Sequence, residues 1–183
     1  MRAVAVRIVG IAALLAVVAL YCYYSAKRLD RLHRRIDAAG AALDSQLRRR
    51  AATVAELIAS GELPAATATT LTSLVTDAQS VTALSHDREV VENALSRGLA
   101  DLAERTPQLF LSPSTAAAEV HDEALRATIA RRFYNDTVRD ALALRDKRVV
   151  RWLGLAGHAP HPAYFEMDDE ELPAPQISVA SRA

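Results

Sequence analysis

The sequence predicts an all-α protein, in which an N-terminal transmembrane helix precedes an antiparallel bundle of about four helices. Three observations lead to this prediction. An uninterrupted apolar run extends from Ile8 to Tyr24. Aromatic residues make up only 5% of the 183 residues, whereas Ala, Leu, Arg, Asp and Glu, which suit helices, are plentiful. Apolar residues beyond the run recur at three- and four-residue steps, without the alternation typical of strands.

Residues 1–26 form the predicted membrane anchor. A helix rises about 1.5 Å per residue, so about 20 apolar residues cross the hydrocarbon core of a bilayer. Arg7 lies close enough to one end of the run to reach the interface. Tyrosines close the other end, where aromatic rings favour the headgroup zone. The anchor residues are Ile8, Leu14, Leu15, Val18, Leu20, Tyr21 and Tyr24.

The alternative to a permanent anchor is a cleaved signal peptide, which needs small residues after a short apolar region. Here the run is long and ends in Tyr-Cys-Tyr-Tyr, which favours an uncleaved anchor. Cys22 is the only cysteine and therefore excludes an internal disulfide. We interpret it as a small apolar anchor residue, with reversible acylation as the alternative. Tyr21 before it does not fit a lipoprotein signal, which would have a small residue there.

Basic residues flank the anchor unequally. Arg2 and Arg7 precede it, and five bases follow within Lys27–Arg35. The positive-inside rule therefore places the N-terminus outside and the body in the cytoplasm of a single-pass cell-membrane protein. The segment Lys27–Arg35 is also expected to attract anionic lipid, at about 1 kcal/mol per base near the surface.

The chain as a whole carries 22 basic and 22 acidic residues. This balance gives no general attraction to nucleic acid. The basic cluster Arg48–Arg50 has no interleaved aromatic residues, so we interpret it as an exposed helix face. No nucleic-acid partner is predicted.

The first helix of the predicted bundle, residues 27–167, is continuous with the anchor and runs to about Ser60 without a proline. Gly61 and Pro64 then form a stop signal. Apolar residues of this helix lie on one stripe, which is a candidate seam between copies and predicts a homo-oligomer. The seam residues are Leu32, Ile36, Leu43 and Leu47.

Three further helices are predicted over residues 64–84, from Ser85 or Asp87 to about residue 105, and from Ser112 to about residue 145. The apolar link 109–111 is expected to pack on the end of the bundle. Apolar residues are expected to line the inner side of the last helix: Ala118, Leu125, Ile129, Phe133, Val138 and Leu142.

The segment Ala130-Arg131-Arg132-Phe133-Tyr134-Asn135-Asp136 resembles the signature of the LemA family, as does the closing Tyr164-Phe165-Glu166. The first helix, with Arg35-Ile36-Asp37, is similar to the family's membrane-proximal helix. The resemblance covers about residues 26–170 and indicates a divergent member, in which Thr53–Leu57 stand in place of the usual proline and asparagine. It implies a short anchor, a helical bundle and no established activity. The motif residues are Arg131, Arg132, Tyr134, Asn135, Asp136, Tyr164 and Phe165.

Tyr134 and Asn135 point about 100° apart around a helix, so they do not converge on one small ligand. We interpret them as structural residues, and one of them is expected to hydrogen-bond the returning C-terminal segment. A ligand site is the alternative.

Metal and catalytic sites are not predicted. His158 and His161 share a loop, with His86 and His121 elsewhere, but a transition-metal site needs three or four converging ligands. The acidic residues after Met167 lack the glycine and spacing of a calcium loop, and residues 168–183 are predicted to be an acidic, then disordered tail. Phosphate loops, nucleophile elbows, zinc motifs and dinucleotide fingerprints are absent from the sequence. We therefore predict no metal, no cofactor and no enzymatic activity.

The leading functional hypothesis is a noncatalytic, membrane-anchored helical scaffold or protein-interaction module, with a membrane or cytoplasmic protein partner. The alternative is a ligand-sensing or signal-transfer subunit of a membrane complex. A cavity lined by convergent polar side chains inside the bundle would favour the sensor. A dry core of alanine and leucine would favour the scaffold.

Overall fold

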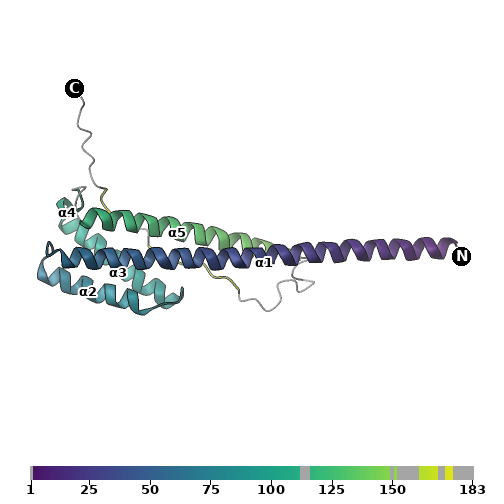
Figure 1. Cartoon of the computed structure of the whole chain (residues 1–183), viewed down its shortest axis with the longest axis horizontal. Coiled ribbons are helices and arrows are strands. Elements are labelled where there is room, and N and C mark those ends of the chain that lie inside the picture. Colours follow the sequence, from purple (N-terminus) through teal and green to yellow (C-terminus); the bar gives the residue numbers. More distant parts are fainter. Residues whose placement is uncertain (1, 112–115, 149–150, 152–160, 169–171, 175–183) are drawn as a thin grey trace, which may run out of the picture. The chain divides into compact units, whose positions relative to one another are not determined.

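Helix α1 is a single unbroken helix of 58 residues, Arg2–Ala59, in the computed structural model (Figure 1). The structure describes residues 2–111, 116–148, 151, 161–168 and 172–174. The other helices are α2 (Ala65–Ser80), α3 (His86–Arg105), α4 (Pro107–Leu111) and α5 (Ala116–Arg145). Within the described residues there is no strand. The prediction of an all-α chain with a long first helix is confirmed.

The helix boundaries follow local signals in the sequence. Gly61 has a φ of 75°, a left-handed conformation that glycine adopts without strain, and it follows the end of α1. Ser85 caps α3, because its hydroxyl accepts a hydrogen bond from the Arg88 backbone N–H. The expected link 109–111 instead belongs to the short helix α4, whose Phe110 is fully buried. The predicted start at Ser112 lies outside the described residues.

The chain forms two compact units. One comprises Met1–Ala38 with Asp136–Ala163, and the other comprises Ala39–Asn135 with Tyr164–Ala183. Helices α1 and α5 contribute residues to both units. The predicted boundaries after residues 26 and 167 separate an anchor, a bundle and a tail, and they do not coincide with these units. Most of the predicted tail lies outside the described residues.

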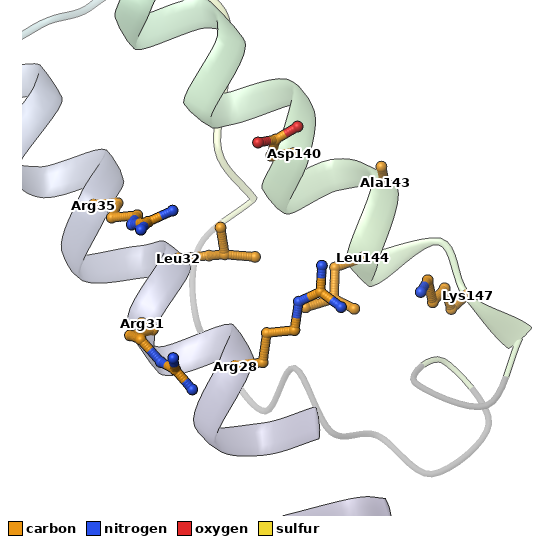
Figure 2. A pocket seen from close by; sticks show the side chains of 8 residues that line it. All are labelled: Arg28, Arg31, Leu32, Arg35, Asp140, Ala143, Leu144 and Lys147. Atoms are coloured by element: carbon orange, nitrogen blue, oxygen red, sulfur yellow. The ribbon is translucent and has the colours of Figure 1, made fainter. Parts of the chain in front are cut away.

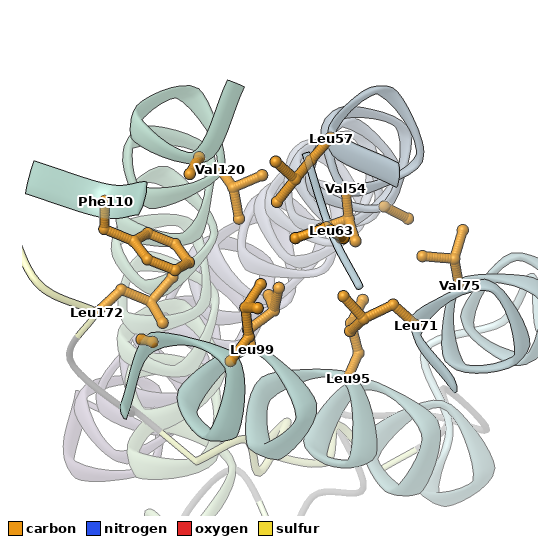
Figure 3. Close-up of a cluster of buried hydrophobic side chains, with 14 of the residues drawn as sticks. Val54, Leu57, Leu63, Leu71, Val75, Leu95, Leu99, Phe110, Val120 and Leu172 are labelled. Carbon is orange, nitrogen blue, oxygen red and sulfur yellow. The ribbon is translucent and has the colours of Figure 1, made fainter. Parts of the chain in front are cut away.

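The larger unit has an apolar core that draws on every helix (Figure 3). Helices α2 and α3 approach closely at Gly98, where a Cβ would lie only 2.6 Å from Leu74 Cδ1. Phe110 from α4 and Leu172 from the C-terminal segment complete one side of the core. The other principal core residues are Val54, Leu57, Leu63, Leu71, Val75, Leu95, Leu99 and Val120.

The smaller unit has a small apolar core between α1 and α5. Leu29 and Leu32 of α1 pack with Ala141 and Leu144 of α5, and Ile36 lies against them. This cluster is the only apolar cluster found among the described residues of the unit, and its members follow the stripe predicted for the membrane-proximal part of α1.

The predicted inner face of α5 is confirmed at Ala118 and Val138, which are buried, and is wrong at three large residues. Leu125, Ile129 and Phe133 are 52%, 58% and 64% exposed. Smaller residues, including Ala117, Ala127 and Val120, occupy the buried face in the larger unit. Small side chains allow the helix to pack closely, so the large apolar residues four apart lie on its outer face.

Candidate functional site

The N-terminal part of α1 is long and apolar enough to cross a membrane. Its most apolar window has a mean hydropathy of 2.6, and none of that window is buried within the structure. A core helix of a soluble protein would instead bury such a stretch. The seven predicted anchor residues are all exposed, from 42% at Val18 to 64% at Leu14 and Tyr24.

Aromatic and basic side chains meet at the end of the apolar stretch. The rings of Tyr23 and Tyr24 lie edge to face, with centroids 5.7 Å apart. Lys27 Nζ lies 4.8 Å from the centroid of the Tyr23 ring, within the range of a cation–π interaction. This arrangement is typical of a headgroup zone, where amphipathic rings and lysine stems cover apolar surface.

A concave surface follows immediately, between α1 and the end of α5 (Figure 2). It encloses about 380 Å³, and we call it the basic groove. Leu32 and Leu144, from the core of the smaller unit, form its apolar floor. Figure 2 shows the Arg28 side chain extending from α1 toward Leu144 of α5. Its full lining is Arg28, Arg31, Leu32, Arg35, Asp140, Ala143, Leu144 and Lys147.

The charges of the basic groove are unbalanced. Three arginines and Lys147 face a single carboxylate, Asp140. Arg28, Arg31 and Arg35 are exposed, and in the described part of the chain none of them has an ion-pair partner. A groove lined by an excess of charges of one sign attracts a ligand of the opposite sign when the protein itself does not neutralise those charges.

The sequence predicts the basic segment, but it does not predict that the arginines share a groove with Lys147. Residues 28, 31 and 35 are separated by three and four positions, which places them on one face of a helix. That spacing was a signal for a shared surface. The contribution of Lys147 had no such signal, because it depends on the packing of α5 against α1.

A second charged cluster lies inside the larger unit. The Glu92 carboxylate of α3 is completely buried between two arginines, of which Arg50 of α1 is 2% exposed and Arg88 is 1% exposed. Arg50 Nη2 lies 2.5 Å from Glu92 Oε2, and Arg88 Nε lies 2.8 Å from Glu92 Oε1. Arg50 Nη1 also donates to Ser96 Oγ at 2.9 Å. These are charge-assisted hydrogen bonds, and their burial makes loss of any member costly.

The prediction that the cluster Arg48–Arg50 forms an exposed helix face is wrong for Arg50. Arg50 falls in register with Leu43, Leu47, Val54 and Leu57, at steps of four, three, four and three residues. A charged residue on an apolar stripe indicates a buried partner on a neighbouring helix. Glu92 gives the matching signal, because it lies on the same stripe of α3 as the three leucines 95, 99 and 102.

The expected hydrogen bond from the motif to the C-terminal segment is present. Asn135 Oδ1 accepts from the Phe165 backbone N–H at 2.9 Å, and Asn135 Nδ2 donates to the Phe165 carbonyl at 3.0 Å. Only an amide side chain can donate and accept in this way. Tyr134 packs against the apolar cluster that contains Phe165, whereas Asp136 pairs with Arg139 at 2.9 Å on the surface.

The remaining motif residues do not meet at one site. Tyr164 is 42% exposed, Arg132 is exposed and Arg131 is half-buried. Both arginines have further interactions within the chain. In the described residues the structure brings together only Tyr134, Asn135 and Phe165, through the hydrogen bonds and the apolar cluster just described.

The proposed association seam lies inside the chain. Leu43 and Leu47 are fully buried, packed with Ala127, Phe165 and Met167. Leu32 and Ile36 belong to the core of the smaller unit. These side chains are therefore not at the surface where a second copy would bind.

Histidines do not form a metal site in the described residues. No group of three or more His, Cys, Asp or Glu side chains that could hold a metal ion occurs there. His86 Nδ1 lies 3.0 Å from Glu89 Oε2 at the start of α3. His158 and acidic residues 169–171 lie outside the described residues.

Replacing Asn135 with Asp is expected to release the C-terminal segment around Phe165. An ionised Asp accepts but cannot donate, so it repels the Phe165 carbonyl, at a cost of about 1–3 kcal/mol for the broken pair. Hydrogen exchange measured by mass spectrometry would show faster exchange over residues 161–168. Glu89→Gln is the matched control, because glutamine can still accept from the Glu166 backbone N–H. Equal exchange in both variants would contradict the assigned role of Asn135.

Replacing Glu92 with Gln is expected to lower the free energy of unfolding by about 3–5 kcal/mol, because it leaves two buried guanidinium groups without their counter-charge. Chemical denaturation of the full chain in detergent, followed by circular dichroism, measures this. Asp101→Asn breaks an exposed pair with Arg105 on the same helix and should cost less than about 1 kcal/mol. Equal costs for the two variants would contradict the importance of the buried cluster.

No protein-family model, curated protein or solved structure matches the chain.

Proposed function

We propose that this chain is a noncatalytic, single-pass membrane protein that presents a helical scaffold or interaction module at the cytoplasmic face of the cell membrane. The observation that carries the proposal is the exposed apolar stretch of α1, which continues without a break into the helices of the folded part. In this proposal the helices pack as an antiparallel bundle, and the anchor keeps that bundle next to the lipid surface.

The interior of the larger unit supports a scaffold rather than a ligand sensor. Its main cluster consists of apolar side chains, and the buried charges Arg50, Arg88 and Glu92 bind one another. Two hollows in the described part lie at the surface: the basic groove, and one of about 520 Å³ lined by residues 62–64 and 105–109. A polar chamber inside the core would have favoured the sensor.

We also propose that the chain is a divergent member of the LemA family. Two separate segments carry the resemblance, one in α5 and one ending in Tyr164-Phe165-Glu166. Hydrogen bonds from Asn135 join these two segments, which gives the shared motif a structural reason. A structural motif agrees with a family in which no activity is implied.

The outer face of α5 is the surface that we propose for self-association. Leu125, Ile129 and Phe133 form an exposed apolar stripe, and such stripes on soluble surfaces mark interaction sites. We commit to a second copy of this chain as the occupant. The exposed residues Asp122, Arg126 and Arg132 place both signs of charge beside the stripe, as a self-complementary interface requires. Anchoring in one membrane also raises the effective concentration of the copies.

Cysteine labelling in intact cells tests the anchor and its orientation. Cys22→Ser removes the only cysteine, and Ser73→Cys introduces a thiol on the exposed side of α2. The protein should remain with membranes after alkaline extraction, and Cys at position 73 should react with an impermeant maleimide only after the membrane is opened. Release by alkali would refute the anchor, whereas labelling of intact cells would refute the cytoplasmic orientation alone.

Thiol crosslinking in isolated membranes tests self-association. In the Cys22→Ser background, Ile129→Cys should give a product of twice the chain mass of 19.8 kDa with a short bismaleimide. Val90→Cys is the matched control, because Val90 is 51% exposed on α3 and lies away from the stripe. Adding Phe133→Glu should remove the product, since it puts a charge into the apolar contact. Absence of a dimer at position 129, or an equal yield at position 90, would refute self-association through α5, as would a product containing another protein.

A further inference from the structure

We propose that the basic groove binds the headgroup of one anionic phospholipid, drawn from the leaflet at which α1 leaves the membrane. The inference deepens the proposed function and rests on its membrane anchor. This proposal differs from general attraction between a basic segment and a charged surface. It assigns binding to the side chains that line the groove and gives no role to neighbouring bases of equal charge.

The end of the groove nearest the anchor lies at the depth of lipid headgroups. At about 1.5 Å per residue, Arg28 lies about 6 Å beyond Tyr24 along the helix axis, and Arg35 lies about 16 Å beyond it. The headgroup region is about 5–8 Å thick on each side of the hydrocarbon core. If Tyr24 marks the end of the hydrocarbon, as its aromatic neighbours indicate, the groove begins within the headgroup layer at Arg28 and extends outward beyond it to Arg35.

The groove offers a lipid phosphate several donors at once. Arg28, Arg31 and Arg35 of α1 line it together with Lys147, which lies just beyond the end of α5 (Figure 2). Guanidinium groups bind phosphate oxygens through paired, charge-assisted hydrogen bonds. The arginines have no ion-pair partner among the described residues, so a phosphate would not have to displace a carboxylate from them.

The apolar floor fits the part of the lipid next to the phosphate. Leu32 and Leu144 are 8% and 5% exposed, and Ala143 beside them is exposed. The methylene groups of a glycerol headgroup, on the water side of the phosphate, can lie on this surface beside Ala143, whereas inorganic phosphate gains nothing from it. Asp140 is the single acceptor in the lining, and it suits a hydroxyl of the headgroup.

Two bases at the same depth provide an internal control because they are engaged elsewhere. The Lys27 ammonium lies over the Tyr23 ring, and Arg34 Nε donates to the Asp30 carbonyl at 3.4 Å. Neither of them lines the groove. General attraction to a charged surface depends equally on all of these bases, whereas the affinity for a headgroup in the groove depends only on the bases that line it.

Lipid binding to the full chain in an uncharged detergent distinguishes these cases. Native mass spectrometry would count dioleoylphosphatidylglycerol and dioleoylphosphatidylcholine retained by the protein. The wild-type chain should retain one phosphatidylglycerol in preference to phosphatidylcholine. The double variant Arg28→Gln/Arg35→Gln should bind phosphatidylglycerol about 30-fold more weakly, from about 1 kcal/mol per base. The equally charged variant Lys27→Gln/Arg34→Gln should bind as the wild type does.

Each other outcome overturns the proposal. Equal losses in the two double variants would show surface attraction only, and equal retention of the two lipids by the wild type would show no headgroup site. Lys147→Gln tests the contribution of α5, and wild-type binding in this variant would refute the convergent site. Inorganic phosphate that displaces the lipid at a concentration similar to that of a soluble short-chain phosphatidylglycerol would indicate a free-anion site instead.

The lipid site in the groove and the membrane anchor can be refuted independently of each other. Lipid is added to protein in detergent, so binding does not depend on insertion into a membrane. Circular dichroism of each variant confirms helicity, and exposed Arg28 and Arg35 can be replaced without disturbing the core. Loss of lipid selectivity with a chain that stays in alkali-washed membranes refutes the groove only.

Discussion

Helix α1 must satisfy two environments with one unbroken backbone, and the rest of the structure depends on this constraint. Within the anchor its apolar side chains are exposed all around the helix, as hydrocarbon requires. After Lys27 one stripe is apolar, and each of the three apolar clusters found among the described residues includes side chains of that stripe. The backbone hydrogen bonds continue through the change of solvent, because no proline or glycine pair interrupts them.

The apolar stripe of α1 specifies a buried face but leaves its alignment with α3 weakly defined. If α1 were displaced by one turn along α3, leucines spaced by three and four residues would still contact leucines. Arg50 and Glu92 remove this freedom, because a displaced Arg50 would be a buried charge without its carboxylate. Replacing the whole cluster with apolar residues could preserve stability, so the cluster is better understood as fixing alignment than as adding free energy.

The sequence predicts the positions of the helices better than it predicts which face of each helix is buried. The stop at Gly61 and the cap at Ser85 are local signals, readable without knowledge of packing. The sequence predicts the face of α5 only in part: Ala118 and Val138 are buried as expected, whereas Phe133 stays outside because the small residue Ala127 occupies the buried face. The hydrogen bonds of Asn135 were anticipated in kind, since a polar residue beside an apolar helix face needs a partner.

The candidate sites show the same division between local and tertiary information. Bases after an apolar run predict orientation, and a count of charges is enough for that purpose. A count cannot separate Lys27, which lies over an aromatic ring, from Arg28, which lines a concave surface with Lys147 from the far end of α5. The two residues are adjacent in sequence and equal in charge, so only their surroundings distinguish them. Specific recognition of a headgroup therefore has to arise from the packing of α5 on α1, even though every arginine involved belongs to α1.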